Sequence, residues 1–186
     1  MGRASRADAA RHREEIVRAT ARLLRERGSA ISVQDVMAAA GLSHGGFYRH
    51  FASKDELLAI AATEAFESVA ARQAHFADEE DGRERFVRQY LSPEHRDAAG
   101  EGCANAALAT EVAHSPQDAP IREAYSRGVE DMLRFLTGLD GDRGRAVLEL
   151  STLVGAISLA RATNGTPLSD EVLGTVAAAL TARRNG

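Results

Sequence analysis

The sequence predicts an all-α protein of about nine helices, with a small helix-turn-helix unit at the N-terminus and a larger helical body after it. Alanine, leucine, arginine and glutamate, which are strong helix formers, supply much of the chain, and only four of its 186 residues are proline. No segment alternates apolar and polar residues as a half-buried strand does. Glycines and serines fall at the spacings that end one helix and begin the next.

The first two helices are delimited by glycines and by a capping box. Apolar residues at helical spacing predict a helix over about residues 8–27, which Gly28 ends. Ser32 stands three residues before Asp35, the spacing of a capping box, and predicts the start of a second helix. Gly41 is placed to end that second helix.

A short third helix and a long fourth helix complete the N-terminal unit. Ser43 is expected to cap the third helix, in which Phe47 and Phe51 are four residues apart and face the core together. A second capping box at residues 53–56 predicts the fourth helix. The second and third helices, joined by a glycine turn, form a helix-turn-helix motif over about residues 33–52.

The rest of the chain predicts five further helices separated by short loops. A helix over 142–164 is apolar around most of its circumference, so it needs partners on more than one side. Ser169 is expected to cap the last helix, and the segment 92–102 reads as irregular. The other expected helices cover about residues 83–91, 103–113 and 120–136.

Charge is distributed unevenly along the chain. The total is −4, yet residues 1–51 carry nine arginines against five acids, a net of +4, which leaves −8 for the remainder. A basic N-terminal unit on an acidic body predicts that the N-terminal unit binds the phosphates of a nucleic acid. A solvent-exposed charged face on the first helix would also explain the arginines. No stretch has the length of a membrane span or a signal peptide, so a cytoplasmic protein without membrane contact is expected.

The stretch "ISVQDVMAAAGLSHGGFYRHFASKDELL", within residues 11–70, resembles the DNA-binding domain of the TetR family of bacterial transcriptional regulators, of the TetR/AcrR type. The resemblance implies a homodimer that binds a palindromic operator and releases it when a small molecule fills the body. It divides the chain into a basic helix-turn-helix DNA-binding domain, residues 1–56, and a helical ligand-binding and dimerisation domain, residues 57–186.

The resemblance also implies which residues meet double-stranded DNA. Tyr48 and His50 would contact the backbone, Lys54 would meet a phosphate, and base reading would fall to His44 with Tyr48 or Arg49. Arginines of the N-terminal arm, Arg3 or Arg6, can enter a minor groove. The full set is Ser32, Ser43, His44, Gly45, Gly46, Tyr48, Arg49, His50 and Lys54.

Several of these residues also have purely structural interpretations. Ser32 and Ser43 would cap helices whether or not DNA is present, although hydroxyl caps at helix N-termini also bind phosphates. Tyr48 can close the small core, and His50 can be a core histidine whose nitrogens are satisfied by protein groups.

Gly45 and Gly46 lie side by side where a helix is expected, and each interior glycine costs about 1 kcal/mol relative to alanine. Inside the first turn this cost is lower, because those amides have no intrahelical partner. The missing side chains let the backbone approach phosphates or base edges closely. We therefore expect Gly46→Leu to abolish DNA binding while the fold survives.

In the family the effector cavity lies within the helical body, and here an apolar cavity with few charges is expected. Such a cavity would suit a small hydrophobic or electrophilic compound of unknown identity. The candidate lining residues are Phe66, Val69, Phe86, Tyr90, Cys103, Leu108, Val112, Tyr125, Met132 and Phe135, all of which can equally be ordinary core.

Cys103 is the single cysteine, and it stands near a helix N-terminus after two glycines. A helix dipole lowers the pKa of a thiol and raises its reactivity, so Cys103 is either a redox or electrophile sensor or an inert buried cysteine. The other possible metal ligands, His75, His95 and His114, lack the spacing of a metal site. No metal and no cofactor are expected.

Dimerisation is expected through the last two helices, because the apolar surface of residues 146–160 needs a partner. The predicted interface consists of Val147, Leu150, Val154, Ile157, Val172 and Val176. No enzyme is expected, since the chain has no phosphate-binding glycine loop and no nucleophile elbow. The alternative function is a helical small-molecule or redox-sensing binding module that does not bind DNA.

Overall fold

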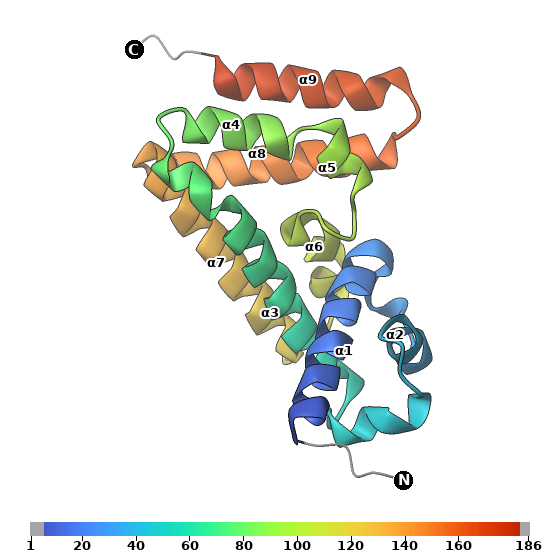
Figure 1. Cartoon of the computed structure of the whole chain (residues 1–186). Helices are drawn as coiled ribbons and strands as arrows, with labels where there is room; N and C mark the ends of the chain where they lie inside the picture. Colours follow the sequence, from blue (N-terminus) through green and yellow to red (C-terminus); the bar gives the residue numbers. More distant parts are fainter. Residues whose placement is uncertain (1–5, 183–186) are drawn as a thin grey trace.

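The computed structural model describes residues 6–182, and that part of the chain is helical without a strand (Figure 1). The predicted all-α class is confirmed. The α-helices are α1 (Arg6–Arg27), α2 (Val33–Ala39), α3 (Lys54–Gln73), α4 (Gly82–Tyr90), α5 (Pro93–Asp97), α6 (Ala104–His114), α7 (Pro120–Asp140), α8 (Arg143–Ala162) and α9 (Pro167–Thr181). Three 3-10 helices complete the list: η1 (Gly28–Ala30), η2 (His44–Arg49) and η3 (Ala74–Asp78).

The predicted boundaries of α1 and α2 are confirmed by their caps. Gly28 has a φ of 71° and Gly41 a φ of 70°, the left-handed conformation in which glycine ends a helix without strain. Ser32 and Asp35 form the complete capping box, with the Ser32 side chain accepting from the Asp35 amide and the Asp35 side chain accepting from the Ser32 amide.

The predicted third helix is a 3-10 helix, η2, and Ser43 makes no capping hydrogen bond there. Its bonds span three residues, from the Gly46 amide to the Ser43 carbonyl and from the His50 amide to the Phe47 carbonyl. Two adjacent glycines give this segment little helical propensity, which is the physical reason for the tighter and shorter helix.

Two predictions for the body were wrong, both next to a proline. The segment expected to be irregular contains α5, where Pro93 occupies the first turn and the Ser92 side chain accepts from the His95 amide. The last helix begins at Pro167, two residues before Ser169, so Ser169 is not its cap. The Ser169 hydroxyl is buried and donates to the Ala160 carbonyl at 2.8 Å, which ties α9 to α8.

Two hydrophobic cores meet along α3. One core joins α1, α2 and η2 to the first part of α3 and to α6, and the other joins the end of α3 to α4, α7, α8 and α9. α3 and α7 run side by side (Figure 1). The predicted domain boundary between residues 56 and 57 therefore falls in the first turn of a continuous helix, with no linker there.

Candidate DNA-binding surface and effector cavity

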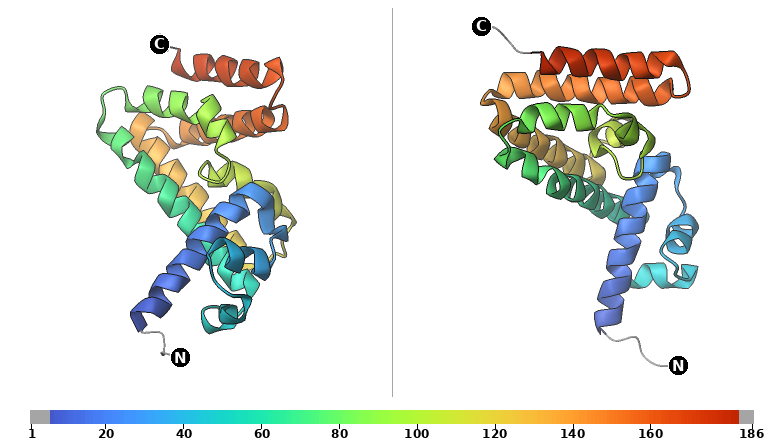
Figure 2. Two further views of the ribbon diagram at one scale, coloured as in Figure 1. Left: turned by 45° about the vertical axis from the view of Figure 1, so that its right-hand side comes forward. Right: turned by 45° about the horizontal axis from the view of Figure 1, so that its top comes forward.

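The helix-turn-helix lies at one end of the molecule, where η2 and the first turns of α1 are neighbours in each view (Figures 1 and 2). Phe47 and Phe51 are buried and hold η2 on the core, with their ring centroids 5.7 Å apart. Tyr48 points outward and is 76% exposed, with its ring only edge-on to Phe47. Tyr48 therefore does not close the core, and its ring is free to meet a partner.

Neither Gly45 nor Gly46 is required by the protein's own geometry. Neither residue has a positive φ. A methyl group on Gly45 would meet nothing within 4 Å, and one on Gly46 would make an ordinary contact of 3.6 Å with the end of Met37. The fold thus tolerates side chains at both positions, and the pair leaves an open stretch of backbone on the surface of η2.

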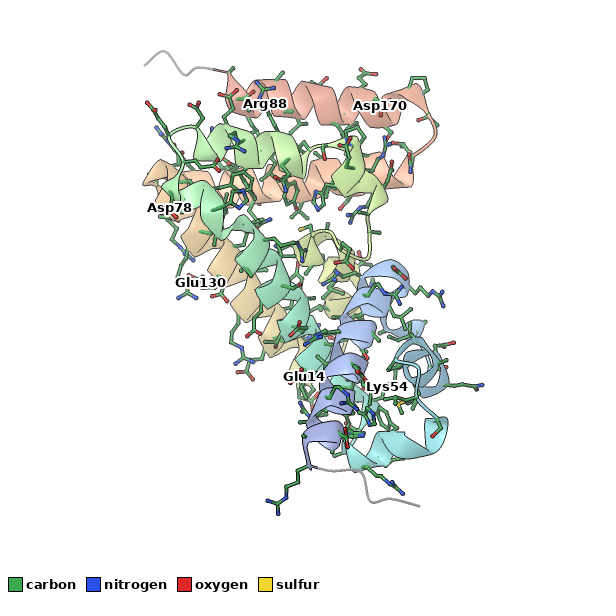
Figure 3. All side chains as sticks on the ribbon, in the orientation of Figure 1. Glu14, Lys54, Asp78, Arg88, Glu130 and Asp170 are labelled. Atoms are coloured by element: carbon green, nitrogen blue, oxygen red, sulfur yellow. The ribbon has the colours of Figure 1, made fainter. Side chains whose placement is uncertain are left out.

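Two of the predicted DNA contacts are already engaged within the chain. The Ser32 hydroxyl donates to the Asp35 carboxylate at 2.5 Å, so the capping box uses its proton. The Lys54 ammonium donates to the Ser29 carbonyl at 2.7 Å, within the N-terminal unit from α1 to the first turn of α3, the head of the molecule (Figure 3). An ammonium has three donors, so one of them positions the turn after α1 and the others can still meet a phosphate.

The remaining DNA candidates divide into described and undescribed side chains. Arg6, Ser43 and Arg49 are exposed, and His50 is half-buried. Neither ring nitrogen of His50 has a hydrogen-bond partner among residues 6–182, so His50 is not a satisfied core histidine. Arg3 and the side chain of His44 lie outside the part of the molecule that the structure describes.

A cavity of about 240 Å³ opens in the body between α3, α4 and the segment from α5 to Cys103. Four of the candidate ligand residues line it: Val69, Phe86, Tyr90 and Cys103. The cavity is not the apolar one that was expected, because the 92–102 segment folds over it and adds polar groups. Its further lining residues are Arg72, Gln73, Phe76, Gln89, Ser92, Glu94, His95, Glu101 and Gly102.

The other six candidate ligand residues do not reach this cavity. Phe66, Met132 and Phe135 line a separate void of about 50 Å³ between α3 and α7. The core that α6 and α7 form with the head contains the other three, Leu108, Val112 and Tyr125. After the first turn of α6, the apolar face of this helix packs toward α1. The prediction of a single site from all ten residues was therefore wrong.

Cys103 is the N-cap residue of α6 and is buried, with its sulfur 2.7 Å from the Tyr90 hydroxyl that donates to it. Burial, and then the neighbouring Cys103 thiol, raise the pKa of Tyr90 well above its usual value, so the phenol stays a neutral donor. The Cys103 amide donates to His95 Nε2 at 2.9 Å. Cys103 is thus held by two hydrogen bonds, one from the Tyr90 hydroxyl to its sulfur and one from its amide to His95.

The hydrogen bonds of His95 define its tautomer. Nδ1 lies 2.5 Å from the Tyr90 carbonyl, which only accepts, so Nδ1 carries the proton and Nε2 is the acceptor for Cys103. Burial is the largest cause that lowers the pKa of His95, which keeps the imidazole neutral in this arrangement. His95 contacts the amide of Cys103 rather than its thiol, so it orients the cysteine and is not placed as its base.

The contacts that join this cavity to the head were not predicted from the sequence. Arg25, in the last turn of α1, is only 8% exposed, and its Nε donates to the Gly100 carbonyl at 2.6 Å. Its Nη1 is buried without a partner, and burial lowers the pKa of the guanidinium. Arg72 donates to the next carbonyl, that of Glu101, at 2.5 Å. Two features of the sequence point to these contacts. One is a basic residue, Arg25, on the apolar stripe of α1, and the other is the pair Ser92-Pro93, which is typical of the start of a helix.

A second connection links the head to the far end of α6. The Ser29 amide donates to the Glu111 carboxylate at 2.9 Å, and the Ser29 carbonyl accepts from Lys54. Hydrogen bonds from the Ser29 side chain, and then from the Ser29 amide, are the largest causes that lower the pKa of Glu111. The turn between α1 and α2 is therefore held on α6 and α3 at once.

The outer face of α8 and α9 carries exposed apolar residues. Leu148 is 70% exposed and Leu159 is 59% exposed, and both lie with Thr152 and Gly155 on one stripe of α8. A groove of about 430 Å³ between α8 and α9 includes Val172 and Val176 of the predicted interface. Leu150 and Ile157 are instead buried in the protomer against α4 and α7, because α8 has two apolar faces.

Two further properties concern the part of the chain that the structure describes. None of its helices has the length and apolar character needed to cross a membrane. Within residues 6–182, no three His, Cys, Asp or Glu side chains converge as metal ligands would.

Comparison with known proteins agrees with this geometry. Residues 16–61 match the model of bacterial regulatory proteins of the tetR family. No curated protein matches the chain significantly in sequence. The NemR structure from E. coli in its reduced form has a TM-score of 0.77 at 18% identity, and the match covers 91% of this chain and 96% of that one.

Two further solved structures extend the likeness over almost the whole chain. The TetR family transcriptional regulator from Agrobacterium tumefaciens has a TM-score of 0.76 at 17% identity, covering 92% of this chain and 96% of that chain. The TetR transcriptional regulator from Chloroflexus aurantiacus has a TM-score of 0.75 at 26% identity, covering 95% and 97%. Residues 16–61 therefore match the helix-turn-helix domain of the tetR family of bacterial regulatory proteins, and the chain shares its overall fold with solved TetR regulators.

Proposed function

We propose that the protein is a ligand-responsive repressor that binds a palindromic operator as a homodimer and releases it when a small molecule fills the body. The observation that carries the proposal is the surface of η2, where an exposed Tyr48 stands beside the open backbone of Gly45 and Gly46. Two such surfaces in a dimer have to lie about 34 to 36 Å apart to enter successive major grooves.

DNA binding itself is the first point to test. Purified protein is expected to retard a palindrome-containing fragment from the DNA that flanks its own gene, with an affinity that falls steeply as salt rises because phosphate contacts release counterions. Gel retardation at about 50 and 200 mM salt measures both features. If no flanking fragment is retarded at low salt, the repressor proposal is wrong and the binding-module alternative stands.

The proposed effector is a small hydrophobic or electrophilic molecule. At about 240 Å³ the cavity beside Cys103 is smaller than the ~300 to 1,000 Å³ of most ligand pockets. An α,β-unsaturated carbonyl would add the Cys103 sulfur to its β-carbon and place the thiol proton on its α-carbon, with no leaving group. Running the retardation assay with N-ethylmaleimide on wild type and on Cys103→Ser separates this class from effectors that bind without reaction.

The proposed route of release runs through the loop that ends at Cys103. An occupant of the cavity touches Glu101 and Gly102, and the carbonyl of the adjacent Gly100 holds the buried Arg25 of α1. Gly100 packs tightly on α1, where a methyl group would come within 3.0 Å of Arg22 Cγ and closer still to the Glu26 carboxylate. Displacing the loop would therefore move the last turn of α1 and with it the head.

Gly100→Ala is expected to imitate the effector. The added methyl group crowds Arg22 Cγ and the Glu26 carboxylate at the end of α1, so operator affinity is expected to fall about 5- to 150-fold, the range of allosteric coupling, without any ligand. Fluorescence anisotropy with the retarded fragment measures the change. Gly138→Ala is the matched control, because a methyl group at that position of α7 meets nothing within 4 Å. Equal affinity of the two variants for the operator would contradict this route.

A further inference from the structure

A groove of about 460 Å³ lies between α1, α3, the end of α2 and the segment before α6. Arg18, Arg22 and Arg25 line it from α1, and Arg72 lines it from α3. It shares only Arg72 and Glu101 with the cavity beside Cys103. Because its other lining residues belong to the groove alone, substitutions there can separate a ligand of the groove from a ligand of that cavity.

Arg25 is the residue of the groove that lacks a partner. It is only 8% exposed, and its Nε donates to the Gly100 carbonyl. Its Nη1 is buried without a hydrogen-bond partner, and no carboxylate within residues 6–182 forms an ion pair with its guanidinium. A guanidinium is always charged, and a buried charge without a counter-charge costs free energy. The unpartnered nitrogen therefore indicates an anion that binds from outside the chain.

Two neighbouring arginines can join Arg25 in holding such an anion. Burial is the largest cause that lowers the pKa of Arg25, while the Glu101 carboxylate opposes this shift and the positive charge of Arg72 adds to it. Arg72 is exposed and donates one N–H to the Glu101 carbonyl. Arg22 pairs with Glu26 at 3.4 Å, an exposed contact that contributes little stability. Both side chains can therefore turn to a ligand at low cost.

The lining of the groove indicates the charge and the shape of the ligand. Four arginines stand against three glutamates, Glu15, Glu64 and Glu101, a net charge of +1. One carboxylate group neutralises this charge and takes two parallel hydrogen bonds from a guanidinium. A phosphate monoester carries about two negative charges and would leave an excess of negative charge beside the glutamates. An apolar group can pack against the four alanines of the wall, Ala19, Ala21, Ala39 and Ala40.

We propose that this groove binds an organic monocarboxylate, whose carboxylate pairs with Arg22, Arg25 and Arg72 while its apolar body lies against the alanines of α1 and α2. The site goes beyond the proposed function, because it lies outside the cavity beside Cys103 and does not require DNA. Through its carboxylate, the ligand joins α1 of the head to α3 of the body.

The test is isothermal titration calorimetry of the full-length protein with 2-naphthoate in a low-salt buffer free of other carboxylates. 2-Naphthamide has the same rings without the charge and is expected to bind about tenfold or more weakly. Arg22→Gln and Arg72→Gln are each expected to weaken 2-naphthoate binding about tenfold, by loss of a charge-assisted hydrogen bond. Both positions are exposed, so these variants test the site even if Arg25→Gln, which also removes the Gly100 contact, fails to fold.

Two controls locate the bound probe. Arg127→Gln removes an exposed arginine of α7 that pairs with Glu123, as Arg22 pairs with Glu26, and it is expected to keep the wild-type affinity for 2-naphthoate. Cys103→Ser changes the other cavity and is also expected to keep that affinity.

Several outcomes would overturn the site. Absence of binding by both 2-naphthoate and the smaller benzoate would do so, as would equal affinity for 2-naphthoate and 2-naphthamide. Wild-type affinity in both Arg22→Gln and Arg72→Gln would also reject it, and a loss in Cys103→Ser without one in Arg22→Gln would place the probe in the other cavity. Tighter binding of 2-naphthyl phosphate would reject the monoanion. No DNA is present in these titrations, so their failure leaves the proposed function untouched.

Discussion

Replacing Gly46 with leucine is expected to reduce operator affinity to that for unrelated DNA, a loss of about 10³-fold or more, while the fold is retained. The physical reason is obstruction. A methyl group on Gly46 makes only an ordinary contact of 3.6 Å with the end of Met37, so a leucine whose remaining atoms turn away from Met37 would stand on the surface of η2. That surface is where the backbone of η2 would approach a base edge or a phosphate.

Two further variants make the interpretation of this loss unambiguous. Gly45→Leu places its side chain in open space, so it tests the same obstruction without any risk to the Met37 contact. Gly138→Leu adds the same side chain to an open position of α7, far from η2. Thermal unfolding and operator anisotropy are measured for all three. Operator binding by Gly45→Leu and Gly46→Leu at wild-type affinity would show that η2 does not enter the groove.

Features with a local cause were predictable from the sequence. The end of α1 at Gly28 and the capping box of Ser32 and Asp35 depend on residues three or fewer positions apart, so the sequence alone contains the whole interaction. The helix-turn-helix follows from the same local order, whereas the sequence left open whether Tyr48 is exposed or closes the small core. The 3-10 form of η2 was missed because two glycines shift a balance between helix types that differ little in free energy.

The cavity in the body depends on contacts that sequence spacing does not encode. Arg25 and Gly100 are 75 positions apart, and their hydrogen bond exists only because α1 packs beside the segment that leads into α6. The polar wall of the cavity follows from α5, whose start at Ser92-Pro93 was visible but whose position over the cavity was not. Apolar residues identified the core of the body, yet periodicity could not assign them to one of its two clusters.

Periodicity also fails to tell which apolar face of a helix is covered, and for this reason two of the predicted interface residues are buried within the protomer. Helix α8 is apolar on two faces, and the sequence offers no means of telling which face the protomer itself covers. The structure assigns Leu150 and Ile157 to the inner face and leaves Leu148 and Leu159 outside. The outer stripe, with Gly155 between the leucines, is therefore the surface on which dimerisation is best tested.

The double variant Leu148→Arg/Leu159→Arg is expected to be a folded monomer that binds the operator about 10²- to 10⁴-fold more weakly. Both side chains are exposed in the protomer, so arginine at these positions costs the monomer little. In a symmetric dimer the same stripe meets itself, and four arginines would face one another without counter-charges. A monomer then binds one half-site only. In a dimer, binding of one head raises the effective concentration of the second head at its half-site, and the monomer lacks this gain.

Light scattering after size-exclusion chromatography measures the mass of the variant, and anisotropy measures its affinity for the full operator and for a single half-site. Ala71→Arg, at an exposed position of α3, is the control for an added surface charge. The variant is expected to bind the half-site as wild type does, because its own η2 is untouched. A dimeric mass with unchanged operator affinity would place the twofold axis on another face, since an interface centred on Leu148 and Leu159 cannot bury four unpaired guanidinium groups.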